Sequence, residues 1–570
     1  MLPRLFLNRN ATRIHSGSLA ENCSGQLEDL SLAILKEIKQ LGFDTLWLTG
    51  LLDHATGADF ASEGKPASHP DVLKGVAGSP YAIRDARDMA PYLFADYGRR
   101  WQTLDKVVQD LKAAGMKLLI DFVPNHTARE YMPSDAGQHP AQVDDTTKFF
   151  DRDNFYYYVG DAFVGPLVVA DRPYEERPAK ATGNDVYSPA PSAYDWYETV
   201  KINYGVDPRT NEGHFGPNRT KPRTWTHIRD NVLFWAEKGI DGMRCDMVDM
   251  VPVAFWKWVI AEVRAQYPDF VFVGESYEEM RYGSFVEAGF GYLYDKVGMY
   301  DAVRNWMEGH GEVGRIGQTM WRNRQYADKL LRFAENHDEQ RLASKQVLGS
   351  YEKGMAVLGA VALAGQGATM VYMGEELGEA GDEVEGFSGA GGKTTIFDFW
   401  GIESLRLAYL GLENGGGNER GYEQEFEHKK KMMARLMGYA CIGNADWELF
   451  NLQGYQTSGY GGGYGELSYD DAMAFARFDV KDVKEAKDGR KSGELVIILV
   501  TRRTNVAAEV NLPADLFEAM GKGIDLEASA ILDRFSETKS EIQLLQTESG
   551  ACVAFEMNDS YLEVIRIRLK

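Results

Sequence analysis

Short apolar segments with the character of β-strands alternate with amphipathic helical segments over the first three quarters of the chain. The strand-like segments lie at residues 45–49, 117–120, 242–245, 271–273, 330–333 and 370–373. Helical patterns accompany them at residues 103–114, 228–238 and 255–267. Apolar strands separated by helices predict a parallel sheet that is buried on both faces, because the helices cover it. So many units in one chain predict an α/β fold, a closed (β/α)8 TIM barrel.

Two regions break this alternation. Residues 127–225 are rich in Asp, Pro, Gly and Tyr, and a segment of that length predicts a small domain inserted after the third strand. Residues 472–478, 494–501, 507–512 and 562–569 alternate like antiparallel strands and predict a C-terminal β-sandwich. The predicted order is therefore the first part of the barrel (1–126), the inserted domain (127–225), the second part of the barrel (226–445) and the sandwich (446–570).

The composition of the 570-residue chain excludes several classes of protein. Its net charge of −23 argues against a surface for nucleic acid, and an acidic membrane would repel it. The four cysteines form no CxxC pair, so we expect reduced thiols and no cysteine-based metal or redox motif. The longest apolar stretch, residues 355–373, contains Gln366 and several glycines, which favours a buried helix and strand over a membrane span. Residues 1–4 lack the apolar core of a signal peptide, so we expect a cytoplasmic location.

Acidic residues follow four of the predicted strands, and histidine or arginine accompanies three of them. In a barrel the carboxyl ends of all strands open on one face, where active sites form. Burying several like charges together is costly unless function maintains the arrangement. We therefore predict an active site from these strand ends, with the candidates Asp121, Asn125, His126, Arg244, Asp246, Glu275, Glu335, His337 and Asp338.

Paired carboxylates without a cysteine or histidine-rich metal site indicate glycoside chemistry. A retaining glycosidase uses one carboxylate as the nucleophile and one protonated carboxyl as the acid, about 5–5.5 Å apart. Arg244, two residues before Asp246, points to the same side of a strand and should keep Asp246 ionised. Glu275 follows Val-Phe-Val-Gly, and a half-buried strand end would raise its pKa, as a general acid requires.

Four motifs together resemble those of the α-amylase family, glycoside hydrolase family 13, in the family's order. They are Asp-Phe-Val-Pro-Asn-His at 121–126, Gly-Met-Arg-Cys-Asp at 242–246, Gly-Glu at 274–275 and Asn-His-Asp at 336–338. Gly-Glu-Glu at 374–376 is similar to the family's eighth-strand signature, and Ser-Pro-Tyr at 79–81 to the site of its stacking tyrosine. Lys-Ile-Asn at 201–203 resembles the form found in neopullulanase-like members.

The resemblance implies a role for each matching residue. Asp246 would be the nucleophile that forms a covalent glycosyl intermediate, and Glu275 would be the acid and then the base. Asp338 would bind sugar hydroxyls most strongly in the transition state. The remaining implied roles are hydrogen bonds to the sugar from His126 and His337, orientation of Asp246 by Arg244, support of Arg244 by Asp121, and stacking beneath the sugar by Tyr81.

The resemblance has one clear departure. Many α-amylases carry Lys and His three and four residues after the nucleophile, where Lys binds substrate and His helps to bind calcium. This chain has Asp249 and Met250 there, although Asn125 stands at the position of one calcium ligand. The chemistry itself requires no cofactor, and the motifs leave a structural calcium ion at Asn125 open.

These motifs predict a retaining α-glucan-active glycoside hydrolase that acts on α-1,4 or α-1,6 glucosidic bonds of malto-oligosaccharides. The first alternative is a transglycosylase or isomerase of the same fold, such as a glucanotransferase or a trehalose synthase. The second is a non-catalytic sugar-binding relative, which the three retained acids Asp246, Glu275 and Asp338 disfavour. Endo or exo action and the oligomeric state stay open at the level of the sequence.

Overall fold

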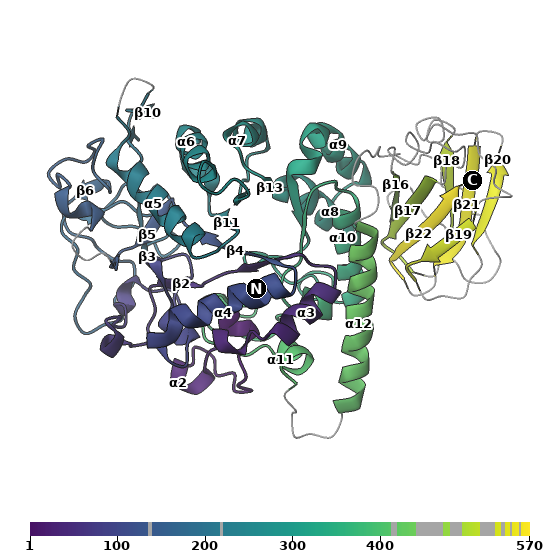
Figure 1. Ribbon diagram of the computed structural model, residues 1–570, viewed down its shortest axis with the longest axis horizontal. Coiled ribbons are helices and arrows are strands. Elements are labelled where there is room, and N and C mark those ends of the chain that lie inside the picture. The colour runs from purple at the N-terminus through teal and green to yellow at the C-terminus, as the bar shows by residue number, and fades with distance from the viewer. Residues whose placement is uncertain are drawn as a thin grey trace. The chain divides into compact units, whose positions relative to one another are not determined.

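A computed structural model of the chain has two compact units. The first comprises Met1–Leu293 and Gly381–Glu423, and the second comprises Tyr294–Ala380 and Gln424–Lys570 (Figure 1). The described residues are 1–134, 139–216, 220–411, 419–440, 471–478, 493–504, 506–513, 530–536, 542–547, 550–557 and 560–569. The predicted boundary at residues 445 and 446 lies outside them, so the four predicted domain limits stay a prediction.

A parallel sheet forms the centre of the first unit. Its strands run in the order β1 (Thr45–Leu48), β4 (Lys117–Phe122), β11 (Gly242–Cys245), β12 (Val271–Gly274) and β13 (Tyr292–Tyr294). Each neighbouring pair is parallel, which confirms the four strands that the sequence predicts in this unit. The sequence analysis missed β13, because three residues are too short to show a period.

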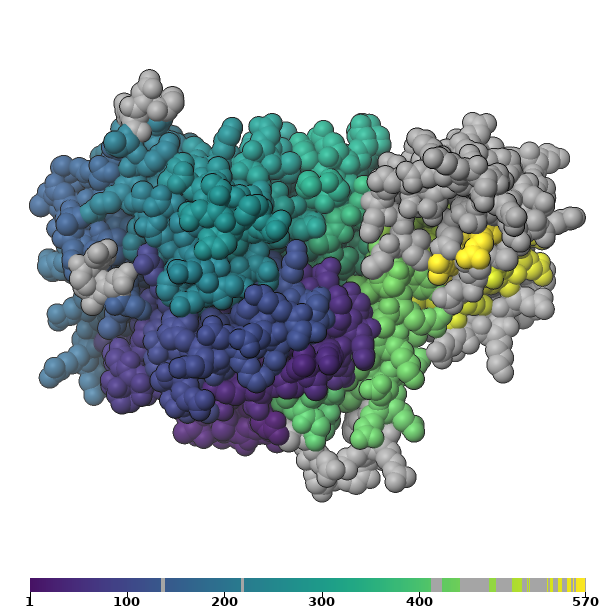
Figure 2. Space-filling model, viewed as in Figure 1, coloured from purple at the N-terminus to yellow at the C-terminus, as the bar shows by residue number. Residues whose placement is uncertain are grey.

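Helices cover this sheet. They include α3 (Leu32–Gln40), α4 (Arg100–Ala113), α5 (Arg223–Glu237), α6 (Val253–Arg264) and α7 (Tyr282–Ala288). Helices α5, α6 and α7 follow one another along one side of the unit, and α3 packs beside α4 on its surface (Figures 1 and 2). Helix α5 shows why these segments pack as helices with one buried face. Its residues Trp225, Ile228, Val232 and Trp235 recur at helical spacing and are all buried.

The register of three neighbouring strands decides which residues meet at the carboxyl edge of the sheet. Arg244 lies opposite Asp121 of β4, and Cys245 lies opposite Gly274 of β12. Asp246 and Glu275 are the next residues along their strands, and their backbone N–H groups donate to Phe122 O (2.9 Å) and Cys245 O (3.0 Å). The two carboxylates therefore stand at the same level of adjacent strands.

The strands of the described residues between β4 and α5 form short antiparallel pairs instead of crossover units. Strand β5 (His126–Ala128) pairs with β8 (Thr199–Lys201), so that His126 lies opposite Lys201. The other pairs are β6 (Tyr158–Gly160) with β7 (Ala179–Lys180) and β9 (Val206–Asp207) with β10 (Glu212–Gly213). The rest of the first unit contains α1 (Pro3–Phe6), α2 (Leu19–Asn22), α11 (Glu403–Leu410) and the antiparallel pair of β2 (Leu52–His54) and β3 (Ile83–Met89).

The second unit contains the last two parallel strands that the sequence predicts. Strand β14 (Leu330–Phe333) is parallel to β15 (Thr369–Met370), which is shorter than the predicted 370–373. The helices are α8 (Asp301–Met307), α9 (Val313–Asn323), α10 (Tyr351–Leu363) and most of α12 (Glu419–Ala440). Helix α10 is buried from Met355 to Leu363, as its apolar sequence predicts. In the part of the chain that the structure describes, no helix is both long and apolar enough to cross a membrane.

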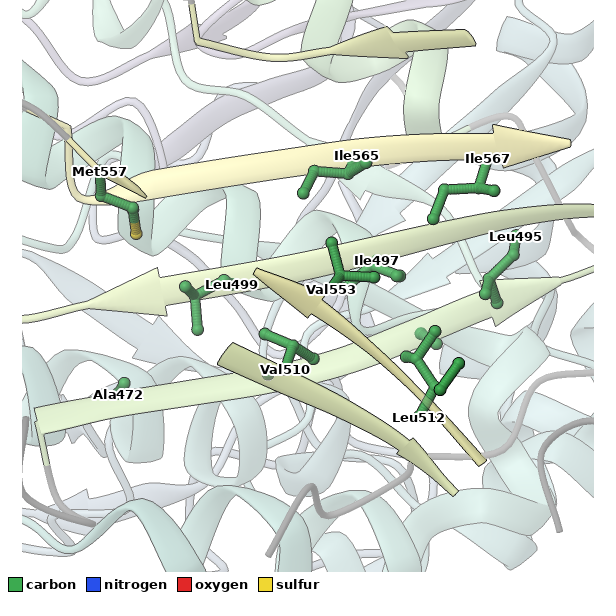
Figure 3. Packing of buried hydrophobic residues seen from close by; sticks show 13 residues of the cluster. Ala472, Leu495, Ile497, Leu499, Val510, Leu512, Val553, Met557, Ile565 and Ile567 are labelled. Carbon is green, nitrogen blue, oxygen red and sulfur yellow. The ribbon is translucent and has the colours of Figure 1, made fainter. Parts of the chain in front are cut away.

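Two antiparallel sheets make up the C-terminal part of the second unit. One has the order β16 (Ala472–Phe478), β17 (Gly493–Thr501), β22 (Leu562–Leu569) and β19 (Ala530–Arg534). The other has the order β18 (Val506–Pro513), β21 (Gly550–Met557) and β20 (Gln543–Thr547). Buried side chains of both sheets, among them Ile497, Leu499, Val510 and Val553, form one cluster (Figure 3). The four strands predicted here are confirmed.

This cluster predicts a difference between two isoleucines of the same four-stranded sheet. Ile497 in β17 is 1% exposed and Ile531 in β19 is 38% exposed. We expect Ile497→Ala to destabilise the second unit by about 2–5 kcal/mol, because it removes buried methylenes and leaves a cavity. The matched variant Ile531→Ala should cost less than about 1 kcal/mol. Urea denaturation of both variants measures this, and equal shifts of the midpoint would contradict the packing described.

Candidate active site

Arg244 connects the two carboxylates at the ends of β11 and β12. Its side chain is 1% exposed, and Nη1 donates to Asp246 Oδ1 at 2.8 Å. Nη2 lies 2.5 Å from Glu275 Oε1, and Nη1 lies 3.7 Å from Asp121 Oδ1. The pleat of β11 directs Arg244 and Asp246 to the same side, as the sequence predicts. One buried guanidinium therefore contacts both carboxylates at once.

Two aromatic rings hold this guanidinium in place. Cζ of Arg244 lies 5.3 Å from the ring centroid of Trp47 and 5.3 Å from that of Tyr81. The Tyr81 hydroxyl donates to Asp121 Oδ1 at 3.5 Å, so Asp121 contacts both Tyr81 and Arg244. Sequence reasoning missed Trp47, because one tryptophan in an apolar strand carries no local signal of a site.

The two oxygens of Asp246 have different surroundings. Oδ1 accepts the hydrogen bond of Arg244, whereas Oδ2 is buried and accepts none from the described residues. Burial and the nearby Glu275 raise the pKa of Asp246 well above its usual value, and Arg244 lowers it. The sequence predicts that Arg244 keeps Asp246 ionised, and Arg244 does lower the pKa of Asp246. Burial and Glu275 raise that pKa by more, and the sequence does not show how deeply Asp246 is buried.

Both oxygens of Glu275 accept hydrogen bonds from residues nearby in sequence or space. The backbone N–H of Met247 donates to Oε2 and the hydroxyl of Tyr277 donates to Oε1, each at 2.8 Å. Met247 has a left-handed φ of 46°, which turns the chain directly after Asp246. Glu275 and Tyr277 are two residues apart directly after β12, and sequence reasoning did not pair them because this spacing outside a strand fixes no side.

His126 is buried next to these residues and is neutral at pH 7. Burial, with a smaller effect of the Lys201 charge, lowers the pKa of His126 to about 3, and its backbone hydrogen bond with Tyr81 opposes this shift. Its ring centroid lies 5.3 Å from that of Trp196. The Asn125 amide nitrogen lies 3.1 Å from His126 Nδ1. The structure thus places His126 beside Tyr81, with Trp196 as a further aromatic neighbour.

The oxygen of Asn125 that would bind calcium is already engaged by an ammonium group. Lys201 Nζ donates to Asn125 Oδ1 at 2.6 Å and to Met250 O at 3.3 Å, and it lies 2.9 Å from Asp185 Oδ1. A divalent cation at these oxygens would collide with Lys201 and be repelled by its charge. These residues therefore suit the ammonium group and do not fit a calcium ion. Nor do the described residues contain a group of three or more His, Cys, Asp or Glu side chains placed to hold a metal.

His337 and Asp338 belong to the second unit and contact each other. Asn336 Oδ1 accepts the backbone N–H groups of Asp338 (2.9 Å) and Glu339 (3.0 Å), which closes a tight turn directly after β14. His337 Nε2 lies 3.0 Å from Asp338 Oδ2, with His337 buried and the Asp338 side chain 45% exposed. The structure thus brings Asp246 and Glu275 together in one unit, and His337 and Asp338 together in the other.

Several known proteins are similar to parts of the chain. An α-1,4-glucan:maltose-1-phosphate maltosyltransferase of Cereibacter sphaeroides is 35% identical over 92 residues, which are 15% of this chain and 15% of that protein. The α-amylase MalA of Haloarcula japonica is 25% identical over 362 residues, 61% of this chain and 41% of that protein. Neopullulanase 2 of Thermoactinomyces vulgaris is 23% identical over 305 residues, 52% of this chain and 44% of that protein. The chain thus spans less than half the length of each.

Solved structures share the fold over almost the whole chain. The α-amylase from H. orenii has a TM-score of 0.57 at 14% identity and covers 96% of both chains. A γ-cyclodextrin glucanotransferase from Bacillus clarkii has a TM-score of 0.59 at 15% identity, over 99% of this chain and 69% of that one. These likenesses and the parallel strands described above are consistent with a TIM barrel. The family model of the α-amylase catalytic domain matches residues 1–435, and the chain therefore belongs to the α-amylase family.

Proposed function

We propose that the protein is a retaining glycoside hydrolase that cleaves α-1,4 glucosidic bonds in malto-oligosaccharides, with α-1,6 bonds as the alternative. The observation that carries this proposal is the Arg244 guanidinium, which contacts Asp246 Oδ1 and Glu275 Oε1 together. Neighbouring strands lie about 4.8 Å apart. Carboxylates at the same level of adjacent strands therefore suit the separation of about 5–5.5 Å in retaining enzymes better than the 6.5–9.5 Å of inverting ones.

In the first step, Asp246 Oδ2 attacks the anomeric carbon of the sugar. Arg244 occupies Oδ1, whereas Oδ2 accepts no hydrogen bond from the described residues, so its lone pairs are available for the new bond. The glycosidic C–O bond breaks as Glu275 transfers its proton to the leaving oxygen. Asp246 then carries the sugar as an ester, and Glu275 is a carboxylate.

In the second step, water replaces Asp246 at the anomeric carbon. The carboxylate of Glu275 takes one proton from the water as its oxygen bonds to the carbon, and the ester bond to Asp246 breaks. Two inversions give a product with the α-configuration of the substrate. We assign to His126, which is neutral, a hydrogen bond to the sugar. The binding of sugar hydroxyls by His337 and Asp338 stays a prediction of the sequence motifs.

A second candidate is transfer of the sugar to another sugar instead of water. The observation that favours it is the group of maltosyltransferases, which are 30–35% identical to this chain over 92 residues. Transfer and hydrolysis share the ester intermediate and differ only in the group that attacks it. Incubation with maltoheptaose separates the two, because hydrolysis gives shorter sugars only and transfer also gives longer ones.

The ammonium group of Lys201 binds the Asn125 oxygen that would be a calcium ligand in the family. We propose that the protein therefore needs no calcium. Lys201 links β8 to Asn125, Asp185 and the carbonyl of Met250, four segments that a bound metal would otherwise join. Burial lowers the pKa of Lys201, while the Asp185 carboxylate raises it, so the contact with Asp185 favours the charged form.

The proposed mechanism is tested at Asp246. Asp246→Ala should reduce the rate of maltoheptaose cleavage by at least about 10³-fold, because no ester intermediate can form. The matched control Asp153→Ala changes a side chain that is 53% exposed and should keep full activity. Chromatography follows the products, and NMR of the fresh products reports the anomer. An active Asp246→Ala enzyme or β-anomeric products from the unmodified protein would refute the proposal.

The proposed independence of calcium is tested at Lys201. Chelation with EDTA should leave both the activity and the melting temperature of the protein unchanged. Lys201→Met should lower the stability by about 1.5–3 kcal/mol, because it removes hydrogen bonds from a charged donor. Lys148→Met, at a lysine that is 53% exposed, is the control and should have little effect. A melting temperature that falls with EDTA and recovers with calcium would show that the proposal is wrong.

A further inference from the structure

The phenol of Tyr277 touches the proposed acid and base directly. Its hydroxyl donates to Glu275 Oε1 at 2.8 Å, the same oxygen that lies 2.5 Å from Arg244 Nη2. The other oxygen, Oε2, accepts the backbone N–H of Met247 at 2.8 Å. Since Glu275 is buried, these contacts act in surroundings where each hydrogen bond has a large effect.

Asp249 fixes the segment that carries Tyr277. Its Oδ2 accepts the backbone N–H of Tyr277 at 2.7 Å, and its Oδ1 accepts the hydroxyl of Ser276 at 3.0 Å. Arg281 Nη1 donates to the carbonyl of Asp249 at 2.6 Å and lies 3.6 Å from Oδ1. The loop after the nucleophile and the loop after the acid are therefore joined by one largely buried carboxylate, whose side chain is 8% exposed.

Each oxygen of a carboxylate offers two lone pairs. On Oε1 of Glu275, the hydroxyl of Tyr277 occupies one, and the cationic Nη2 of Arg244 lies 2.5 Å away in an ion pair without a hydrogen bond. On Oε2, the N–H of Met247 occupies one, and the structure gives no contact of a described residue with the other. The guanidinium charge beside Oε1 disfavours a proton there, so a proton on Glu275 is accommodated on Oε2. Oε1 keeps the hydrogen bond from Tyr277 and the ion pair with Arg244 whether Glu275 is protonated or not, so proton transfer at Oε2 needs no rearrangement of these groups.

We propose that Tyr277 is a positioning residue, held by Asp249, that fixes Glu275 so that Oε2 carries the catalytic proton. This inference rests on the function proposed above and assigns a part of its proton path. In the first step the Oε2–H bond breaks and the proton passes to the leaving glycosidic oxygen. In the second step a proton from the attacking water forms the Oε2–H bond again. Tyr277 gives up no proton in either step.

The proposal predicts a loss that depends on the substrate. Tyr277→Phe should lower kcat/KM for maltoheptaose about 5–30-fold, because both proton transfers of Glu275 lose their alignment. The loss should stay below about 3-fold for α-maltosyl fluoride in the presence of azide, since fluoride leaves without an acid and azide attacks without a base. Asp249→Ala should show the same pattern, because it releases the backbone N–H of Tyr277.

The pH profile provides a second measurement. The Tyr277 hydroxyl donates to Glu275 Oε1 at 2.8 Å, so its removal changes the surroundings of the group that transfers the proton. Tyr277→Phe should therefore change the pH profile of kcat/KM for maltoheptaose, which a merely structural role would leave unchanged. The matched control is Tyr158→Phe, which removes a phenol-to-carboxylate hydrogen bond to Asp144 of 3.0 Å outside the Arg244 cluster. It should leave the profile unchanged.

The outcomes are distinct. A selective loss with a changed pH profile supports the proposal. An equal loss on both substrates indicates a merely structural role and overturns it, as does full activity of Tyr277→Phe on maltoheptaose. Thermal denaturation of each variant identifies a folding defect. An unmodified protein that cleaves neither substrate would overturn the proposed hydrolase function itself, and the assignment of Tyr277 with it.

Discussion

The buried guanidinium of Arg244 is the interaction on which the rest of the site depends. It contacts Asp246 and Glu275 and lies near Asp121, all of them buried. Several buried carboxylates without a cation would repel one another strongly in surroundings of low dielectric constant. The register of β4, β11 and β12 and the rings of Trp47 and Tyr81 serve to keep this one cation in place. The fold of the first unit thus determines the electrostatics of the site through a single side chain.

The sequence was sufficient for the features that depend on local pattern. Apolar strands, their helices and the acidic residues at the strand ends all have a period or a position that is visible within about ten residues. The partners of Lys201 and the ring of Trp47 could not be predicted, because they depend on contacts between distant segments. Lys201 lies 76 residues from Asn125 in the chain. The burial of Asp246 is of the same kind, and it reverses the expected direction of its pKa.

Lys201 and Arg244 are each paired with a carboxylate, at two different places in the first unit. Each is a buried cation that contacts oxygens from different segments. Arg244 has a fixed planar geometry that suits two carboxylates, whereas the ammonium of Lys201 can reach an amide oxygen, a carbonyl and a carboxylate in different directions. An ammonium provides one charge where calcium would provide two, so the oxygens around it need only one carboxylate, Asp185, for neutrality.

The loop after β11 binds to the rest of the first unit at four successive points. Asp246 contacts Arg244, Met247 donates to Glu275, Asp249 accepts from Tyr277, and the carbonyl of Met250 accepts from Lys201. In many α-amylases, the positions of Asp249 and Met250 hold residues for substrate and calcium. In this chain the same two positions fix the loop after β11, and Asp249 also fixes the segment that follows the proposed acid. Asp249 and Met250 are thus both engaged within the protein, Asp249 by Ser276 and Tyr277 and the carbonyl of Met250 by Lys201.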